Sequence, residues 1–456
     1  MSTLSSGASI DGQVAQWRAY LTRRQAIHAV DIDELEDHLR EQVSTLRDSG
    51  LDEDEAFLVA VKRMGAMDAL SREFAHEHSE RLWKQLVSDG RGDPERHAAE
   101  RRDALTAFGL AGAAAVAIKA PSLVNPALWD ERSFYPKNLS LFVLPMLAAY
   151  FVLKRSLSWR IAAVIAAPFI AGAALVNAYP LVPYAQTTAL AAVHLPIVLW
   201  LAVGIAYAGR RWSHTGGRMD FIRFSGEFAI YYVLIALGGA VLCAFMFQIF
   251  RAAGVNINWA FEHWILPCGA MGAAPVAAWL VESKQSVIEN MAPVLARLFT
   301  PLFTVGLLVF LATLLLTGRG VDIERGELIA FDLLLVAVLG LQLYTISARD
   351  PGAPRGVFDI AQAALLASAL IADLVALWAI SARIGEFGWT ANRASAVGMN
   401  VVLLGNLVWS TQLYVRFLLG RTEFARIERW QTDYLPVYGA WAAIVVAVFP
   451  PAFGFR

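Results

Sequence analysis

The pattern of apolar and polar positions in this 456-residue chain changes near Asp103. Before that point, apolar residues recur every three or four positions among charged ones, which predicts amphipathic helices. After it, apolar runs of about twenty residues recur, and each is long enough to cross a hydrocarbon core of about 30 Å as a helix. The pattern predicts an all-α protein with a small cytoplasmic helical bundle (1–88), a linker (89–103) and a polytopic transmembrane helix bundle (104–456).

The apolar runs predict about 10–11 membrane spans. The run at 228–250 is a clear example, because Gln248 is its one strongly polar residue. The expected spans are 104–120, 138–153, 161–178, 187–208, 227–250, 261–281, 298–317, 327–347, 357–379, 395–415 and 437–453.

The basic residues predict the orientation of these spans. With the N-terminal bundle inside, inside connections carry fifteen Lys and Arg and outside connections carry eight, as the positive-inside rule requires. Residues 1–13 lack the basic flank and apolar stretch of a signal peptide. We therefore expect a bacterial inner (plasma) membrane protein with a cytoplasmic N-terminus.

Composition sharpens the difference between the two parts. Overall, 57% of residues are hydrophobic and 17% charged, against about 25% charged in ordinary soluble domains. Residues 1–103 hold 14 Lys and Arg and 21 Asp and Glu, whereas the remainder holds 24 and 18. Since phosphate contacts need a basic face, the acidic bundle argues against direct nucleic-acid binding and favours a protein partner.

Helix start and stop signals divide the N-terminal bundle. Asp31 with Glu34 and Asp52 with Glu55 have the spacing of capping boxes, and Asp68 marks a third start. Gly50 lies where a helix before Asp52 would end. Four helices are expected, the last carrying apolar positions between 70 and 86.

The bundle resembles the "permease prefix" helical domain, which is similar to the HAAS signalling domain and precedes bacterial membrane modules. The resemblance implies a cytoplasmic module, often found with PadR-like transcriptional regulators, and it implies no catalysis. It covers about residues 11–80 and rests on Trp17–Leu21, Glu34–Glu41, Gly50–Phe57, Val61–Gly65 and Leu70–Phe74.

Ionisable residues inside spans are the candidate intramembrane site, since each costs about 2.5–3.5 kcal/mol at mid-membrane on insertion scales. Asp373 lies deep in the ninth span, and Asp359 lies 14 residues before it on the same helical face. The pair could line a proton or cation path. Alternatively, Asp359 is a first-turn acid near Arg355, as Asp332 is in the eighth span, and Asp373 makes a structural bond to Gln342, Asn400, Asn406 or Gln412.

Two further polar features stand out. His194, two residues before Pro196, indicates a kinked fourth span with a hydrogen-bonded imidazole. A polar hairpin outside the membrane carries Arg383, Glu386, Thr390 and Arg393, as a structural corner or a contact to an anion or headgroup. The stretch 379–393, with Phe299–Leu302 and the span spacing, resembles an uncharacterised bacterial membrane family over about residues 295–450, and that family implies architecture rather than activity.

No motif predicts an enzyme, a cofactor or a metal site. The chain lacks a Gly-rich phosphate loop ending in Lys-Ser/Thr, His-Glu-x-x-His and Gly-x-Ser-x-Gly. The leading hypothesis is a sensory or regulatory membrane protein whose bundle engages a cytoplasmic partner, with lipid around its spans. The alternative is a permease-like transporter of a small solute or ion without its own ATPase, with Asp373 and His194 near the pathway.

Overall fold

The computed structural model describes residues 10–22, 29–64, 94–130, 134–283, 292–317 and 325–456, and within these ranges all regular structure is helical. The chain divides into two compact units, Met1–Ala99 and Glu100–Arg456. The fold class expected from the sequence is thereby confirmed. The first unit is called the headpiece below, and the second the membrane unit.

The headpiece has its own apolar core, built by α1 (Ile10–Thr22), α2 (Ala29–Asp48) and α3 (Glu53–Met64). Trp17 and Phe57 are each 1% exposed. They pack with other buried side chains at helical spacing, namely Val14, Leu39, Val43, Leu46, Ala56, Ala60 and Val61. The predicted fourth helix, with His76, His78 and Asp68, lies outside the described residues.

The predicted capping box at the start of α3 is present. The backbone N–H of Glu55 donates to Asp52 Oδ1 at 2.8 Å, and the Asp52 N–H reaches Glu55 Oε2 at 3.5 Å. Gly50, at φ +98°, ends the preceding helix as expected. Asp31 was expected to be an N-cap, but α2 begins at Ala29, so Asp31 lies within its first turn.

Replacing Asp52 with alanine should therefore lower the headpiece's free energy of unfolding by about 1 kcal/mol, since the first turn of α3 loses its side-chain acceptor. Hydrogen exchange of the α3 amides in the full chain measures the change. Asp48→Ala is the control, because Asp48 is exposed at the other end of the same connection. Equal exchange in both variants would show that the cap contributes nothing.

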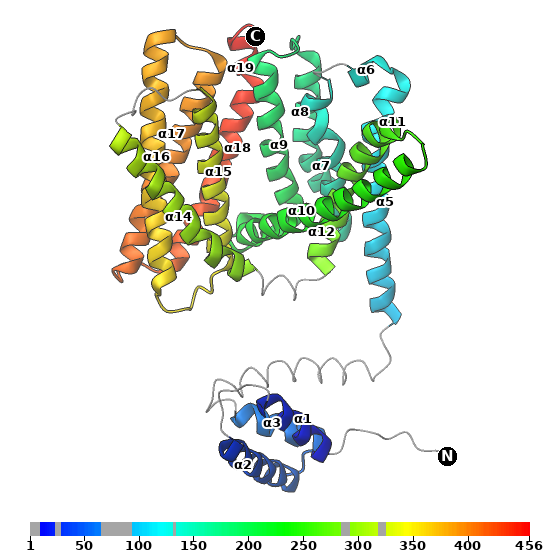
Figure 1. Cartoon of the computed structure of the whole chain (residues 1–456), viewed down its shortest axis with the longest axis vertical. Coiled ribbons are helices and arrows are strands. Elements are labelled where there is room, and N and C mark those ends of the chain that lie inside the picture. The colour runs from blue at the N-terminus through cyan, green and yellow to red at the C-terminus, as the bar shows by residue number, and fades with distance from the viewer. Residues whose placement is uncertain (1–9, 23–28, 65–93, 131–133, 284–291, 318–324) are drawn as a thin grey trace. The chain divides into compact units, whose positions relative to one another are not determined.

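The membrane unit consists of long helices joined by short connections (Figure 1). The helix α5 begins at Pro94, inside the segment predicted as a linker. The helices are α5 (Pro94–Val124), α6 (Ala127–Asp130), α7 (Phe134–Lys154), α8 (Trp159–Ala178), α9 (Gln186–Ala208), η1 (Gly209–Ser213), α10 (Thr215–Ala252), α11 (Asn258–Ala260), η2 (Phe261–Ile265), α12 (Leu266–Ser283), α14 (Ala292–Thr317), α15 (Arg325–Ala348), α16 (Val357–Phe387), α17 (Ala391–Leu418), α18 (Phe424–Ala447) and α19 (Phe449–Ala452).

Eight of the described helices are long and apolar enough to cross a membrane, which supports a multi-pass membrane protein. Two shorter apolar stretches, Arg297–Thr313 in α14 and Asp332–Ala348 in α15, match further predicted spans. The last span was expected at 437–453, but α18 begins at Phe424 and ends at Ala447. A total of 10–11 crossings stays a prediction.

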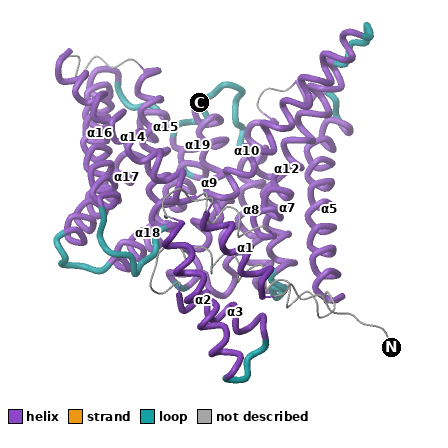
Figure 2. The backbone as a smooth tube through the Cα atoms, turned by 60° about the horizontal axis from the view of Figure 1, so that its bottom comes forward, coloured by secondary structure: helices purple, strands orange, loops and turns teal. Residues whose placement is uncertain are grey.

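The two largest apolar cores lie in different parts of the membrane unit. One gathers side chains from α5, α7, α8, α9 and α10, and the other from α14–α18 together with the start of α10. The helix α9 packs against α7 on one side and α18 on the other, and Figure 1 shows it between the two groups. Figure 2 shows α14, α16 and α17 side by side. This second group, called the α14–α18 half below, contains the predicted carboxylates.

The helix α10 behaves differently from its neighbours. It is 38 residues long and runs obliquely to α9 (Figure 1). Its N-terminal part buries Phe221, Phe224 and Glu227, whereas its most apolar 18-residue window has no buried residue. That window is available to contact lipid.

The contact between α17 and α18 depends on Gly398. A Cβ at this position would overlap the six-membered ring of Trp441 on α18. Gly398→Ala should therefore lower the apparent melting temperature of the purified protein, with a loss of about 1–3 kcal/mol from overpacking. Gly239→Ala, in a helix with nothing within 4 Å of the added Cβ, is the control, and Gly398→Ala with Trp441→Leu should recover part of the loss. A Gly398→Ala protein as stable as the control would contradict this packing.

Candidate functional site

One face of α16 carries the polar side chains that define the candidate site. Asp359, Gln362 and Asp373 are 4%, 1% and 0% exposed, and they follow the same three- and four-residue spacing as the buried Leu366 and Ala369 between them. This spacing places all five on one helical stripe. The sequence prediction that Asp359 and Asp373 share a face therefore agrees with the structure.

Asp359 is held by an arginine at the end of the stripe. Its carboxylate accepts from Arg349 Nε at 2.8 Å and Nη2 at 3.2 Å, and from the N–H of Gly356 at 2.9 Å. The arginine also contacts the face of Phe424, with its guanidinium carbon 4.4 Å from the ring centroid. Asp359 is a first-turn acid, as the sequence allowed, but its cation is Arg349 rather than Arg355.

The next polar contact along the stripe joins α16 to α14. Gln362 Nε2 donates to Thr300 Oγ1 at 2.8 Å, and Thr300 is fully buried. The Gln362 side-chain oxygen has no hydrogen-bond partner. The Gln362 amide and the Thr300 hydroxyl carry no charge, but they place polar atoms in the interior of the α14–α18 half.

Asp373 is the central feature of the site. Its side chain is fully buried, and neither carboxylate oxygen has a hydrogen-bond partner. It lies 16 residues after the start of the 31-residue α16, about 24 Å along the axis at 1.5 Å per residue, and so near the middle of the span. A buried carboxylate without a partner is costly, which makes Asp373 the leading candidate for a functional residue in this half.

A second carboxylate and an amide accompany Asp373. Asp332 belongs to α15, a helix that packs against α16. Asp332 Oδ1 accepts from Asn400 Nδ2 of α17 at 3.0 Å. Asn400 is fully buried, its nitrogen also donates to the Ala396 carbonyl at 2.8 Å, and its side-chain oxygen has no partner. The Asp332–Asn400 bond therefore joins α15 to α17, and both of these helices pack against α16, which carries Asp373.

The other proposed partners of Asp373 have different surroundings. Asn406 forms a buried network with Ser410 and Gln431 of α18, including an Asn406–Gln431 bond of 3.0 Å. Gln342 is fully buried and has no hydrogen-bond partner. Gln412 is exposed. The expected bond from Asp373 to one of these four residues is therefore wrong for the described part of the chain: Asp373 has no hydrogen-bond partner there, and Asn400 bonds to Asp332 instead.

His194 lies in α9, outside this cluster. Its Nδ1 is 2.9 Å from the Leu190 carbonyl, and the residue is 6% exposed. Pro196 is accommodated within α9. The expected hydrogen-bonded imidazole close to a proline fits these contacts. Among the described residues, His194 does not contact Asp373.

The polar hairpin between α16 and α17 supplies hydrogen bonds to the C-terminal end of α16 and the N-terminal end of α17. Thr390 is the N-cap of α17 and accepts from the Arg393 N–H at 3.3 Å, while Arg393 Nη1 donates to the carbonyls of Phe387 at 3.0 Å and Gly388 at 2.7 Å. Arg383 contacts the Phe387 ring, and Glu386 is exposed. These bonds match the structural-corner interpretation of the hairpin.

Sequence reasoning missed a buried cation in α5. Lys119, assigned to an outside connection, lies inside the helix and is 5% exposed. Its Nζ lies 4.0 Å from the ring centroid of Trp129 and 4.8 Å from that of Trp264. The sequence feature that could have predicted this burial is a single Lys near the end of an apolar run, followed later in the chain by tryptophans. Cation–π contact with two indoles explains how it is accommodated.

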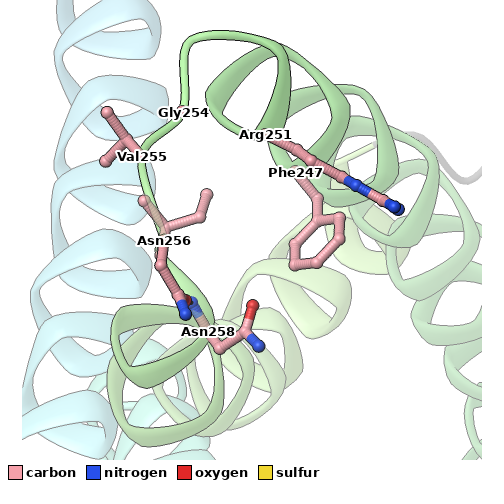
Figure 3. A pocket seen from close by; sticks show the side chains of 7 residues that line it. Phe247, Arg251, Gly254, Val255, Asn256 and Asn258 are labelled. Atoms are coloured by element: carbon pink, nitrogen blue, oxygen red, sulfur yellow. The ribbon is translucent and has the colours of Figure 1, made fainter.

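A surface cavity lies apart from the buried polar side chains of α16. It has a volume of about 320 Å³ and lies in the connection from α10 to α11, where Phe247 and Asn258 face each other (Figure 3). Its lining belongs wholly to residues 247–258, so it includes none of the buried polar side chains.

No protein-family model, curated protein or solved structure matches this chain.

Proposed function

We propose that this protein is a sensory or regulatory membrane protein in which the carboxylate site of the α14–α18 half is the input and the headpiece is the output. The observation that carries the proposal is Asp373, fully buried at mid-span with two unpartnered oxygens. A carboxylate in that environment changes charge when a proton or cation binds or leaves, and that change alters the packing of the three helices around it.

The headpiece suits an output role. It has a separate apolar core and belongs to a different compact unit from most of the membrane helices. Its acidic balance favours a basic surface on a protein partner over nucleic acid. The resemblance to permease-prefix and HAAS-like domains adds the proposal that this partner is a cytosolic regulator, of which the PadR-like class is one example. Both ideas require a bacterial inner membrane with the N-terminus inside.

A permease-like transporter is the second candidate. The specific observation in its favour is the series of buried polar groups in the α14–α18 half, from the Gln362–Thr300 pair through Asp373 to the Asn406–Ser410–Gln431 network. Polar side chains at several depths are typical of ion and solute pathways. In this proposal the headpiece is an assembly element.

An affinity pull-down from native membranes tests the two candidates. The intact chain is compared with a chain lacking residues 1–90 and with Phe57→Asp, which places a charge in the headpiece core. Regulation predicts that one cytosolic protein is lost with both variants and that its recovery changes in Asp373→Asn. An unchanged partner set in every variant would overturn the regulatory proposal, and Asp373-dependent uptake by proteoliposomes would then support transport.

A further inference from the structure

We propose that a basic cavity at one end of α7, α8 and α9 binds the headgroup of an anionic phospholipid. The cavity has a volume of about 300 Å³. Its lining comes from the connection 155–158 between α7 and α8, from residues 208–210 where α9 meets η1, and from Ile161 in the first turn of α8. The inference goes beyond the proposed function, because it concerns helices outside the α14–α18 half, and neither proposal depends on the other.

Arg155 and Arg210 give the cavity its positive charge, and none of the described residues that line it is acidic. Arg155 is partly neutralised, since its Nη2 donates to Glu282 Oε2 at 3.2 Å and its Nε to the Tyr207 carbonyl at 3.3 Å. Glu282 is in turn paired with Lys154 at 3.1 Å. Arg210 is exposed, and its side chain makes no hydrogen bond or ion pair with any described residue. The charge of Arg210 is therefore available to a ligand.

Hydrogen-bond donors accompany this charge. Ser158 lies at the N-cap position of α8, and its hydroxyl makes no capping bond. The first N–H groups of a helix have no acceptor within the helix, and the first turn of α8 carries no acidic side chain. A guanidinium together with hydroxyl and amide donors suits the oxygens of a phosphate group. The chemistry of the cavity therefore favours a phosphate-type anion.

The surroundings of the cavity favour a lipid over a free anion. The helices α7, α8 and α9 are each long and apolar enough to cross a membrane, so their ends lie near the bilayer surface. Trp159 beside the cavity is 75% exposed, with the Arg160 guanidinium carbon 5.7 Å from its ring centroid, and exposed tryptophan is typical of that level of a membrane. Val164, one turn after Ile161, is 67% exposed. Apolar surface thus continues along α8 from the cavity, where an acyl chain can lie.

The charge of the cavity selects among phospholipids. A zwitterionic headgroup such as that of phosphatidylcholine brings its own ammonium group toward Arg210, whereas phosphatidylglycerol brings a net negative charge. Basic pockets between membrane helices are typical sites for anionic headgroups. The positive-inside count expects both connections on the inner side, where the surface potential of a membrane is negative.

Thermal unfolding of the purified full-length protein in neutral detergent micelles tests the site. Phosphatidylglycerol is added at increasing mole fraction, with phosphatidylcholine and inorganic phosphate as separate arms. The proposal predicts a saturable rise in melting temperature of about 2 °C or more with phosphatidylglycerol alone. Arg210→Gln should raise the phosphatidylglycerol fraction needed for half of this rise about fivefold, the effect of one basic side chain near a lipid surface. Arg211→Gln is the matched control, because Arg211 does not line the cavity and pairs with Asp220 at 3.0 Å.

A second variant separates the cavity from general surface charge. Ser158→Trp places an indole at the cavity without changing the charge, and it should also lose the response to phosphatidylglycerol. The full response in either Arg210→Gln or Ser158→Trp would overturn the site, and so would an equal loss in Arg211→Gln. Equal stabilisation by phosphatidylcholine would overturn the anionic headgroup, and stabilisation by inorganic phosphate alone would overturn the lipid. These measurements involve neither a cytosolic partner nor Asp373, so they leave the proposed function to its own test.

Discussion

Replacing Asp373 with leucine should raise the free energy of unfolding of the protein. The substitution exchanges a fully buried carboxylate without hydrogen bonds for an apolar side chain of similar size. Removing an unsatisfied buried polar group recovers about 1–3 kcal/mol. Thermal unfolding of the purified protein, compared with the unsubstituted chain, measures the change. A gain in stability on replacing a functional residue is common, because functional sites often keep groups that destabilise the fold.

Asp359→Leu is the matched control, because Asp359 lies on the same stripe of α16 but is paired. Its removal leaves the Arg349 guanidinium buried without its carboxylate, so this variant should be destabilised while Asp373→Leu is stabilised. A loss of several kcal/mol in Asp373→Leu would instead show that Asp373 makes a stabilising contact. That result would make the residue part of the scaffold.

Replacing Arg349 with methionine should destabilise the membrane unit by about 3–5 kcal/mol. The side chains of Arg349 and Asp359 are 11% and 6% exposed, so the change leaves an uncompensated carboxylate inside the protein. The guanidinium also donates to the Ala353 carbonyl at 3.1 Å. Thermal unfolding of the purified protein measures the loss.

Two further variants show whether loss of the Arg349–Asp359 ion pair causes the lower stability of Arg349→Met. Arg349→Met combined with Asp359→Leu should recover much of the stability, because neither charge remains buried alone. Arg355→Met is the control, since Arg355 stacks on Phe417 at 5.3 Å and has no recorded ion pair. If the Arg355 variant proved as unstable as the Arg349 variant, the loss would not come from the buried pair.

The features that sequence predicted well are local. The Asp52–Glu55 capping box forms because its four residues suffice to satisfy the first turn of α3. The membrane helices follow from hydropathy alone, as at α9, expected at 187–208 and observed at Gln186–Ala208. The start of α18 was predicted too late, at residue 437 instead of Phe424, because the charged residues between these positions lower the mean hydropathy. Asp433 is accommodated there by Arg218 of α10 at 2.7 Å, a partner 215 positions away.

The features that sequence could not predict depend on how helices rotate against one another. Gln342, Asn400, Asn406 and Gln412 were all plausible partners for a buried carboxylate, and their spacing in the sequence does not show which helix faces meet. The Asp332–Asn400 bond joins residues 68 positions apart. Arg355 was the expected partner of Asp359 because it is nearer in sequence, but the connection before α16 turns Arg349 toward the carboxylate. Such pairings follow from tertiary packing, which overrides local proximity.

The length and exposure of α10 tie this protein to the thickness of its bilayer. A helix of 38 residues extends about 57 Å, nearly twice a hydrocarbon core of about 30 Å. Its N-terminal part is fixed by packing, but no neighbouring helix buries its apolar window. Hydrophobic mismatch is then relieved by tilting α10. A thinner membrane requires a larger tilt, and Arg223 near the anchored end of α10 donates to the Ser347 carbonyl, so the C-terminal end of α15 is the part of the α14–α18 half most directly exposed to such a change.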